Sequence, residues 1–344
     1  MGIEASSGTR KFYLSISMPE MTTKEIKKSL LYTMLKIRRF EEKIMDVYPE
    51  QEMKTPVHLY IGEEAIAVGV CANLKQDDYI FTTHRNHGHC IAKGVDIKLL
   101  AAELYGKGTG CSRGKGGSMH PVDPEHGILG TSAIVGGGIA LAVGSALASK
   151  LKKENKISVA FFGDGAVDEG AFYESVNFAA LRRLPIVFVC ENNFYATNSP
   201  QSARQPLDNI FQRVLSFGIP TVQIDGNDVL EIYSKSKEYI ERARAENAPA
   251  LIECRTFRFR GHVGPEDDCE KGYRPKKELE EWLEKCPIET YKNELIKNKE
   301  LSTSDFQDMV REIDSHIESA FKFAKESRFP VAEELYKDVY YEKR

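Results

Sequence analysis

Residues 157–193 read ISVAFFGDGAVDEGAFYESVNFAALRRLPIVFVCENN, and this stretch decides the fold. Its two apolar runs, ISVAFF and PIVFVC, are short and rich in β-branched and aromatic residues, so they predict buried strands. The segment between them carries apolar residues at helical spacing and predicts a helix of about four turns. A strand, a helix and a second buried strand in succession are typical of a parallel sheet.

The same alternation continues on both sides of this unit. Further elements are expected as an amphipathic helix behind a Thr N-cap at 22–48, a small-residue helix at 135–154, strands at 221–228 and 249–259, and a helix at 228–247 between those strands. Residues 56–135 are rich in Gly, His and polar residues, so ordered loops and short helices are expected there.

These elements predict an α/β fold, a doubly wound parallel sheet flanked by helices. We expect a flexible N-terminal arm at 1–20 and one α/β domain at 21–280. After Pro275 the sequence is charged and helical in pattern, which predicts a C-terminal helical appendage at 281–344.

Polar clusters follow the two central strands. Asp164, between Gly163 and Gly165, ends the first strand, and Asn193 ends the second, 29 positions later. A strand–helix–strand crossover can bring the two strand ends into one crevice, where ligands bind in open parallel sheets. Mg²⁺ prefers carboxylate and amide oxygens together with phosphate and water. The pattern therefore predicts a magnesium and phosphate site, with the flanking glycines leaving room for a close backbone approach.

The spacing GDG, 26 residues, NN resembles the thiamine diphosphate signature. The longer text resembles the α subunits of pyruvate, branched-chain 2-oxo acid and acetoin dehydrogenases. Segments in that family's order, within residues 25–275, are HLYIGEEAIAVGV, DDYIFTTHRNHGHCIAKG, GKGGSMH, GILGTSAIVGGGIALA and RFRGHVGPED. The resemblance implies the thiamine diphosphate-binding fold, with thiamine diphosphate and Mg²⁺ as cofactors.

Site residues follow from the same resemblance. It implies that Mg²⁺ is bound by Asp164, the side chain of Asn193 and the carbonyl of Tyr195. It implies cofactor contacts from His84 and Arg85 at the diphosphate, Gly127 and Leu129 at the aminopyrimidine through their backbones, and Gly165 and Ala166 through their amides. His58 and His262 match the family's active-site histidines, His262 lying on a loop that closes over the cofactor.

The resemblance also implies an activity and partners. The reaction would be oxidative decarboxylation of a small 2-oxo acid, with acyl transfer to the lipoyl arm of an acyltransferase. In this family the glutamate that activates the cofactor belongs to a β subunit, so the chain is expected to work in an α2β2 heterotetramer and to be inactive alone. The loop Val263–Asp268 lacks the regulatory serine of animal pyruvate dehydrogenases, so kinase control there is not expected.

Composition excludes several other functions. A net charge of −4 over 344 residues gives no electrostatic reason to bind nucleic acid or an anionic membrane. No apolar run reaches the length of a bilayer span, and the N-terminus lacks a secretion signal, so a cytoplasmic protein is expected. The loose myristoylation pattern at residues 1–6 is given little weight. Seven scattered cysteines indicate reduced thiols rather than disulfides or a zinc ribbon.

Several alternatives stay open. His84, His87 and His89 are close enough in sequence to suggest zinc, although Cys partners and an HExxH pattern are lacking. Gly136–Gly138 could suggest dinucleotide binding, but GxGxxG is absent and no strand is expected immediately before it. Small residues at Gly136, Ala140 and Gly144 better predict a subunit interface. The competing functions are a thiamine diphosphate-dependent carboligase or lyase of the same build, and a catalytically silent scaffold subunit.

Overall fold

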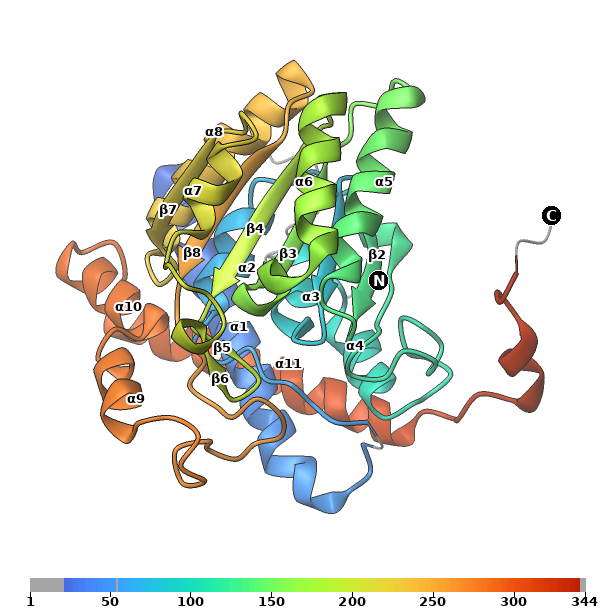
Figure 1. Cartoon of the computed structure of the whole chain (residues 1–344). Helices are drawn as coiled ribbons and strands as arrows, with labels where there is room; N and C mark the ends of the chain where they lie inside the picture. The colour runs from blue at the N-terminus through green and yellow to red at the C-terminus, as the bar shows by residue number, and fades with distance from the viewer. Residues whose placement is uncertain (1–21, 54, 341–344) are drawn as a thin grey trace, which may run out of the picture.

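Six parallel strands form the central sheet of the computed structural model, which describes residues 22–53 and 55–340. The arm expected at 1–20 lies outside the described residues. The strand order is β2-β1-β3-β4-β8-β7, and a separate hairpin pairs β5 with β6 (Figure 1). The strands are β1 (Tyr79–Thr83), β2 (Ile128–Ser132), β3 (Ser158–Gly163), β4 (Ile186–Asn192), β5 (Tyr195–Ala196), β6 (Ser199–Pro200), β7 (Thr221–Asp225) and β8 (Ala250–Arg255).

Helices cover both faces of the sheet, as predicted. They are α1 (Thr23–Val47), α2 (Glu64–Cys71), α3 (His87–Lys93), α4 (Ile97–Leu104), α5 (Gly137–Leu151), α6 (Gly170–Arg182), α7 (Ile210–Leu215), α8 (Val229–Glu246), α9 (Lys276–Leu283), α10 (Pro287–Lys297) and α11 (Thr303–Glu326). The predicted N-cap of α1 is confirmed, because the Thr22 side chain accepts a hydrogen bond from the amide of Glu25.

Alternate side chains of β3 and β4 point into two separate cores. Val159 and Phe161 belong to the larger core, which includes residues of α1, α2 and α8. Ala160 and Phe162 belong to the smaller core with residues of α5, α6 and α7. Since successive side chains of a strand point to opposite faces, a continuous apolar run is what a strand covered on both sides requires.

The C-terminal helices share the larger core. Ile313, Ile317 and Phe321 of α11 are buried in it, and α9 crosses the domain boundary expected at residue 280. On the outer side, the Arg39 guanidinium of α1 pairs with Asp314 of α11 at 2.8 Å. The helical region is therefore packed against the body of the protein, while the exact domain limits stay a prediction.

Two strands lie where the sequence predicted loops and short helices. Both β1 and β2 have only five residues, and both end in hydroxyl side chains instead of an apolar run. They form the β2-β1 edge of the sheet beside β3. Since β2 ends four residues before Gly136, a strand does precede that glycine run, contrary to the expectation from sequence. The GxGxxG pattern is still lacking.

The glycine-rich loop after α4 is organised by one buried carboxylate. Glu103 is fully buried, and its two oxygens accept hydrogen bonds from the backbone amides of Ser112, Gly114, Gly116 and Gly117 at 2.7–3.1 Å. Gly114 and Gly117 have φ of +77° and +57°, a region that favours glycine. The carboxylate thus accepts the hydrogen bonds of backbone amides in a loop that has no neighbouring strand to accept them.

Among the described residues, no helix combines the length and the apolar character needed to cross a lipid bilayer.

We predict that Glu103→Gln destabilises the protein. A neutral amide keeps one acceptor oxygen but turns a donor toward backbone amides that also donate, so buried N–H groups lose their partners. The free energy of unfolding should fall by about 2–4 kcal/mol. Chemical denaturation of the full chain measures this loss, with the exposed Glu125→Gln as control. Equal stability of the two variants would contradict the role given to Glu103.

Candidate active site

A cavity of about 350 Å³ opens at the carboxyl ends of the central strands. Its volume lies in the range of small-molecule sites. The lining comes from segments far apart in sequence: His58, Glu63, Thr83, His84, Arg85, Met119, Ala133, Val135, Gly163, Asp164, Gly165, Ala166, Glu191, Asn193, Tyr195, Ala196, Thr197 and His262. The cavity therefore contains nine of the eleven site residues that the sequence indicated.

Asp164 and Asn193 reach the same cavity because β3 and β4 are neighbours. The two strands pair in parallel register, with Gly163 opposite Glu191, so Asp164 and Asn193 follow adjacent strand ends. This geometric expectation of the sequence is confirmed.

The Asp164 carboxylate is buried and only half engaged. One oxygen pairs with the Arg204 guanidinium, which also pairs with Asp168. The other oxygen, Oδ1, has no hydrogen-bond partner among the described residues. Burial raises the pKa of Asp164, and Arg204 counteracts this rise. A buried carboxylate oxygen without a partner is costly unless a ligand completes the site.

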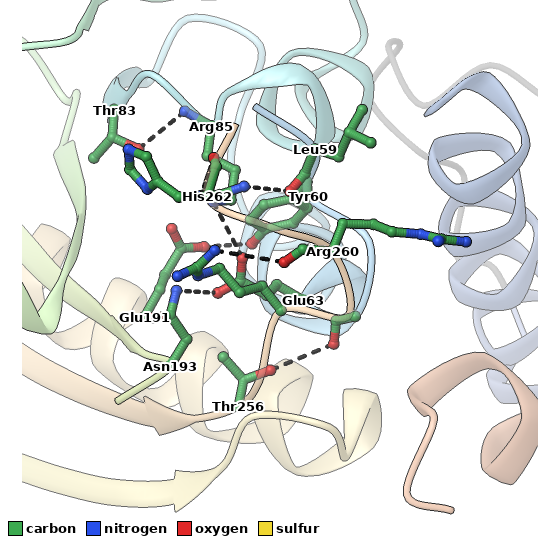
Figure 2. Close-up of polar contacts among 12 residues, drawn as sticks. Leu59, Tyr60, Glu63, Thr83, Arg85, Glu191, Asn193, Thr256, Arg260 and His262 are labelled. Atoms are coloured by element: carbon green, nitrogen blue, oxygen red, sulfur yellow. Dashed lines mark hydrogen bonds and ion pairs between the residues drawn. The ribbon is translucent and has the colours of Figure 1, made fainter. Parts of the chain in front are cut away.

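Asn193 is oriented by Glu63, which the sequence analysis did not single out. The Asn193 side-chain amide donates to Glu63 Oε1 at 2.9 Å (Figure 2). The Asn193 side-chain oxygen accepts from the backbone amide of Tyr195 at 3.3 Å. Burial raises the pKa of Glu63 to about 7, while nearby Arg85 acts to lower it. Two adjacent glutamates, at 63 and 64, inside the apolar run HLYIGEEAIAVGV were the signal for a buried charge.

Arg85 connects three segments around the cavity. Its guanidinium donates to the carbonyls of Leu59 at 2.5 Å and His262 at 3.2 Å, and its Nε lies 3.5 Å from Glu63 Oε2 (Figure 2). Arg85 is buried, so its charge is fixed in position close to Asn193 and Glu63.

A second buried carboxylate, Glu191, lines the cavity beside Asn193. It accepts hydrogen bonds from the Tyr60 hydroxyl and shares a contact of 2.9 Å with His89 Nε2. Burial raises the pKa of Tyr60 well above its ordinary value, and the negative charge of Glu191 raises it further. Tyr60 therefore remains a hydrogen-bond donor to this carboxylate.

Three histidines from separate loops meet in the cavity. The ring of His58 lies 4.4 Å from that of His84 and 5.1 Å from that of His262, and the His84 and His262 rings are 5.2 Å apart, centroid to centroid. Burial, followed by the Arg85 charge, lowers their pKa values to about 3, 2 and 4 for His58, His84 and His262. All three imidazoles are therefore neutral at physiological pH.

The zinc group suggested by sequence spacing does not form. His87 contacts Glu41 at 3.1 Å and Ser118 at 2.9 Å, one through each ring nitrogen. His89 likewise contacts Thr82 and Glu191. Both are fully buried in α3, whereas His84 precedes the helix and faces the cavity.

Gly127 and Leu129 are the two indicated residues that do not line the cavity. Gly127 forms the turn before β2 with φ of +72°, and its carbonyl accepts from the amide of Ile80. Leu129 packs against the smaller core. Both lie at the amino end of β2, whereas the cavity lies at the carboxyl ends. Ala133 and Val135, which follow β2, line the cavity instead.

The two glycines that flank Asp164 differ in the space around them. A Cβ atom on Gly165 would lie 2.7 Å from Cβ of Ala196, whereas one on Gly163 would meet only the Glu191 carbonyl oxygen, at 3.9 Å. The absence of a side chain at Gly165 thus serves close packing against β5.

Comparison with known proteins identifies the family. The family model described as "Dehydrogenase E1 component" matches residues 32–333. The α subunit of acetoin:2,6-dichlorophenolindophenol oxidoreductase from Bacillus subtilis is 46% identical over 90% of this chain and 92% of that protein. The chloroplastic pyruvate dehydrogenase E1 component subunit alpha-3 from Arabidopsis thaliana is 38% identical over 93% of this chain and 76% of that protein. The pyruvate dehydrogenase E1 component subunit alpha from Rickettsia felis is 37% identical over 89% of this chain and 93% of that protein.

These relatives agree with the resemblance carried by the sequence motifs and favour a dehydrogenase over the carboligase or lyase that the sequence left open. The cavity beyond β3 and β4 lies within the matched residues. The chain therefore belongs to the dehydrogenase E1 component family, as the α subunit of a thiamine diphosphate-dependent 2-oxo acid dehydrogenase that works with a β subunit.

Proposed function

We propose that this α subunit binds the diphosphate of its cofactor through Mg²⁺ in the cavity beyond β3 and β4. With its β subunit it would decarboxylate a small 2-oxo acid oxidatively and pass the acyl group to a lipoyl-bearing acyltransferase. The observation that carries the proposal is the unpartnered Oδ1 of Asp164 at the strand end next to Asn193.

The donor set fits magnesium. Asp164 offers a carboxylate oxygen, Asn193 an amide oxygen, and Tyr195 a backbone carbonyl two residues further on, and all three residues line the cavity. These are hard oxygen donors, and Mg²⁺ binds through few protein groups, leaving positions for phosphate and water. Arg204 already compensates the other oxygen of Asp164, so the carboxylate can keep its charge in a buried place.

The neighbouring residues fit a diphosphate. The Arg85 guanidinium is a planar donor suited to phosphate oxygens, and Gly165 and Ala166 offer backbone amides at the start of a short helical turn. His84 is placed beside Arg85 and can donate a hydrogen bond from its neutral ring. For the aminopyrimidine contact first assigned to Gly127 and Leu129, Ala133 and Val135 are the residues of this segment that line the cavity.

When bound, thiamine diphosphate supplies the carbon nucleophile for a 2-oxo acid. The chain's own contribution is binding and orientation. His58 and His262 would hold the substrate through neutral imidazoles, which can donate one hydrogen bond and accept another. The Tyr60 hydroxyl donates a hydrogen bond to Glu191 at the cavity wall and so restricts the rotation of that carboxylate.

Partners are proposed as an α2β2 heterotetramer and a lipoyl-bearing acyltransferase. The small-residue face of α5 is the proposed subunit contact, because Ala140 and Gly144 are exposed and Leu141 is 58% exposed. The cytoplasmic location rests on the sequence alone. Because Asp164, Asn193 and Arg85 meet in one cavity, a silent scaffold is disfavoured. The name of the Bacillus relative makes acetoin a second candidate substrate.

The function is tested by reconstitution. The purified chain should show no turnover of pyruvate, a branched-chain 2-oxo acid or acetoin with 2,6-dichlorophenolindophenol as electron acceptor. Addition of the β subunit should restore activity with at least one of them, and acyl transfer to a lipoyl domain separates a complex component from a carboligase. Turnover by the α chain alone would overturn the subunit assignment.

We predict that Asp164→Asn and Asn193→Ala weaken magnesium-dependent cofactor binding. Each removes a hard ligand, so thiamine diphosphate affinity should fall by at least about tenfold, the lower end of what even outer-shell changes cost a metal site. Calorimetric titration of the reconstituted heteromer with and without Mg²⁺ measures the loss. The exposed Asp46→Asn and Asn177→Ala variants are matched controls and should bind normally. Unchanged affinity in both site variants would place the metal elsewhere.

The cofactor-free protein should lose stability as Glu63 ionises. Burial raises the folded-state pKa of Glu63 to about 7, so folding favours its protonated form. This contribution is present below the unfolded-state pKa and is lost as pH rises through about 7. The variant Glu63→Gln keeps the acceptor for Asn193 but cannot ionise.

Denaturation curves from about pH 5 to about pH 8 measure the difference. The unchanged protein should lose more stability over this range than Glu63→Gln, with the exposed Glu174→Gln as control. Parallel curves for the protein and Glu63→Gln would show that Glu63 is ionised throughout.

A further inference from the structure

Three loops bring imidazoles together on one side of the cavity. His58 precedes α2, His84 lies between β1 and α3, and His262 follows β8. Their candidate ligand nitrogens all lie within 4.8 Å of one another. The magnesium donors proposed above are oxygen atoms at the ends of β3 and β4, so this nitrogen cluster is a separate set of ligands.

Backbone contacts fix the positions of these loops. The amide of Gly264 donates to the Val57 carbonyl at 2.8 Å, and the amide of Phe259 donates to the Ile61 carbonyl at 2.9 Å. The segment around His262 is thus tied to both sides of His58. The His262 carbonyl also accepts from Arg85, the residue after His84, at 3.2 Å. The cluster is therefore held before any ligand binds.

The imidazoles are in the state that metal ions require. His58 Nδ1 is buried and has no hydrogen-bond partner among the described residues. Neutral imidazole is the ligand form, so no proton has to be displaced from it at physiological pH. By contrast, His87 and His89 have both ring nitrogens engaged.

Charges of both signs surround the cluster. The described cavity lining carries three carboxylates, Glu63, Asp164 and Glu191, and one guanidinium, Arg85. Arg85 lies near Glu63 at 3.5 Å, and the adjacent Arg258 pairs with Asp268 at 3.1 Å. Each arginine therefore has a carboxylate beside it, but both arginine charges still lower the pKa of the three histidines. Bonds from the imidazole nitrogens to the metal ion must outweigh this repulsion.

We propose that His58, His84 and His262 form a binding site for a borderline divalent transition-metal ion of the Zn²⁺ class. Zinc–imidazole bonds of about 2.0–2.1 Å imply a nitrogen–nitrogen separation of roughly 3.3 Å in a tetrahedron. The three nitrogens lie within 4.8 Å of one another, so the proposal requires them to move closer by up to about 1.5 Å. Three protein ligands leave the fourth position open to water or to an oxygen of a small molecule.

A metal ion bound at this site would prevent His58 and His262 from contacting the substrate, the role that the proposed function gives them. The ion would therefore inhibit the enzyme, and a chelator would reverse the inhibition. This consequence rests on the proposed function, whereas the metal site itself does not.

The test uses Co²⁺ as a visible probe on the full chain purified with its β subunit, without thiamine diphosphate and with excess Mg²⁺ to fill hard oxygen sites. We expect about one equivalent of Co²⁺ to give visible absorption of a nitrogen-ligated site, and Zn²⁺ to displace it. His58→Asn, His84→Asn and His262→Asn should each weaken binding by at least about tenfold. His316→Asn, which removes an exposed histidine of α11, is the control.

Two further arms keep the result decisive. X-ray absorption of the Zn²⁺-loaded, unmutated protein should show three imidazole nitrogens at about 2.0–2.1 Å, which needs no variant to fold. Asp164→Asn should retain Co²⁺ binding although it loses magnesium-dependent cofactor binding. Co²⁺ affinity that is unchanged in all three histidine variants, or that disappears in Asp164→Asn, would overturn the site while leaving the proposed function to its own test.

Discussion

The parallel pairing of β3 with β4 is the constraint on which the rest of the structure depends. Their register sets Gly163 opposite Glu191, so the residues that follow emerge side by side at one edge of the sheet. Asp164 and Asn193 acquire their proximity from this pairing alone, since α6 and the turns around it separate them in sequence. The strands can pair in this way because their side chains enter two cores, one on each face.

The buried carboxylates Asp164 and Glu63 at the cavity each have only one oxygen engaged in a hydrogen bond. Arg204 engages one oxygen of Asp164, and Asn193 engages one oxygen of Glu63, while the second oxygen of each carboxylate has no hydrogen-bond partner among the described residues. A folded protein tolerates such groups where a ligand is bound during function. The incomplete hydrogen bonding thus marks the same place as the strand topology, by an independent physical criterion.

The sequence could predict the elements whose signals are local. The apolar runs of β3, β4 and β8 and the Thr cap of α1 were recognised because each is visible within a few residues. The short strands β1 and β2 were missed because Thr and Ser replace the apolar residues at their ends. Gly127 and Leu129 do not line the cavity, and their contact with the cofactor stays a prediction, because a motif does not reveal which end of a strand faces the cavity. Glu63 was overlooked because its partner Asn193 comes from a distant strand.

Two kinds of ligand atom line the cavity, and they come from different parts of the fold. Oxygen donors come from the rigid ends of β3 and β4, and imidazole nitrogens come from loops that hydrogen bonds tie together. Hard ions such as Mg²⁺ prefer the first set, and borderline ions such as Zn²⁺ prefer the second. Burial and Arg85 keep the histidines neutral, and a neutral imidazole can hydrogen-bond a small molecule or offer its lone pair to a metal ion. The Arg85 charge also repels a cation, so a transition-metal ion at this cluster would have to be held by its bonds to the imidazole nitrogens.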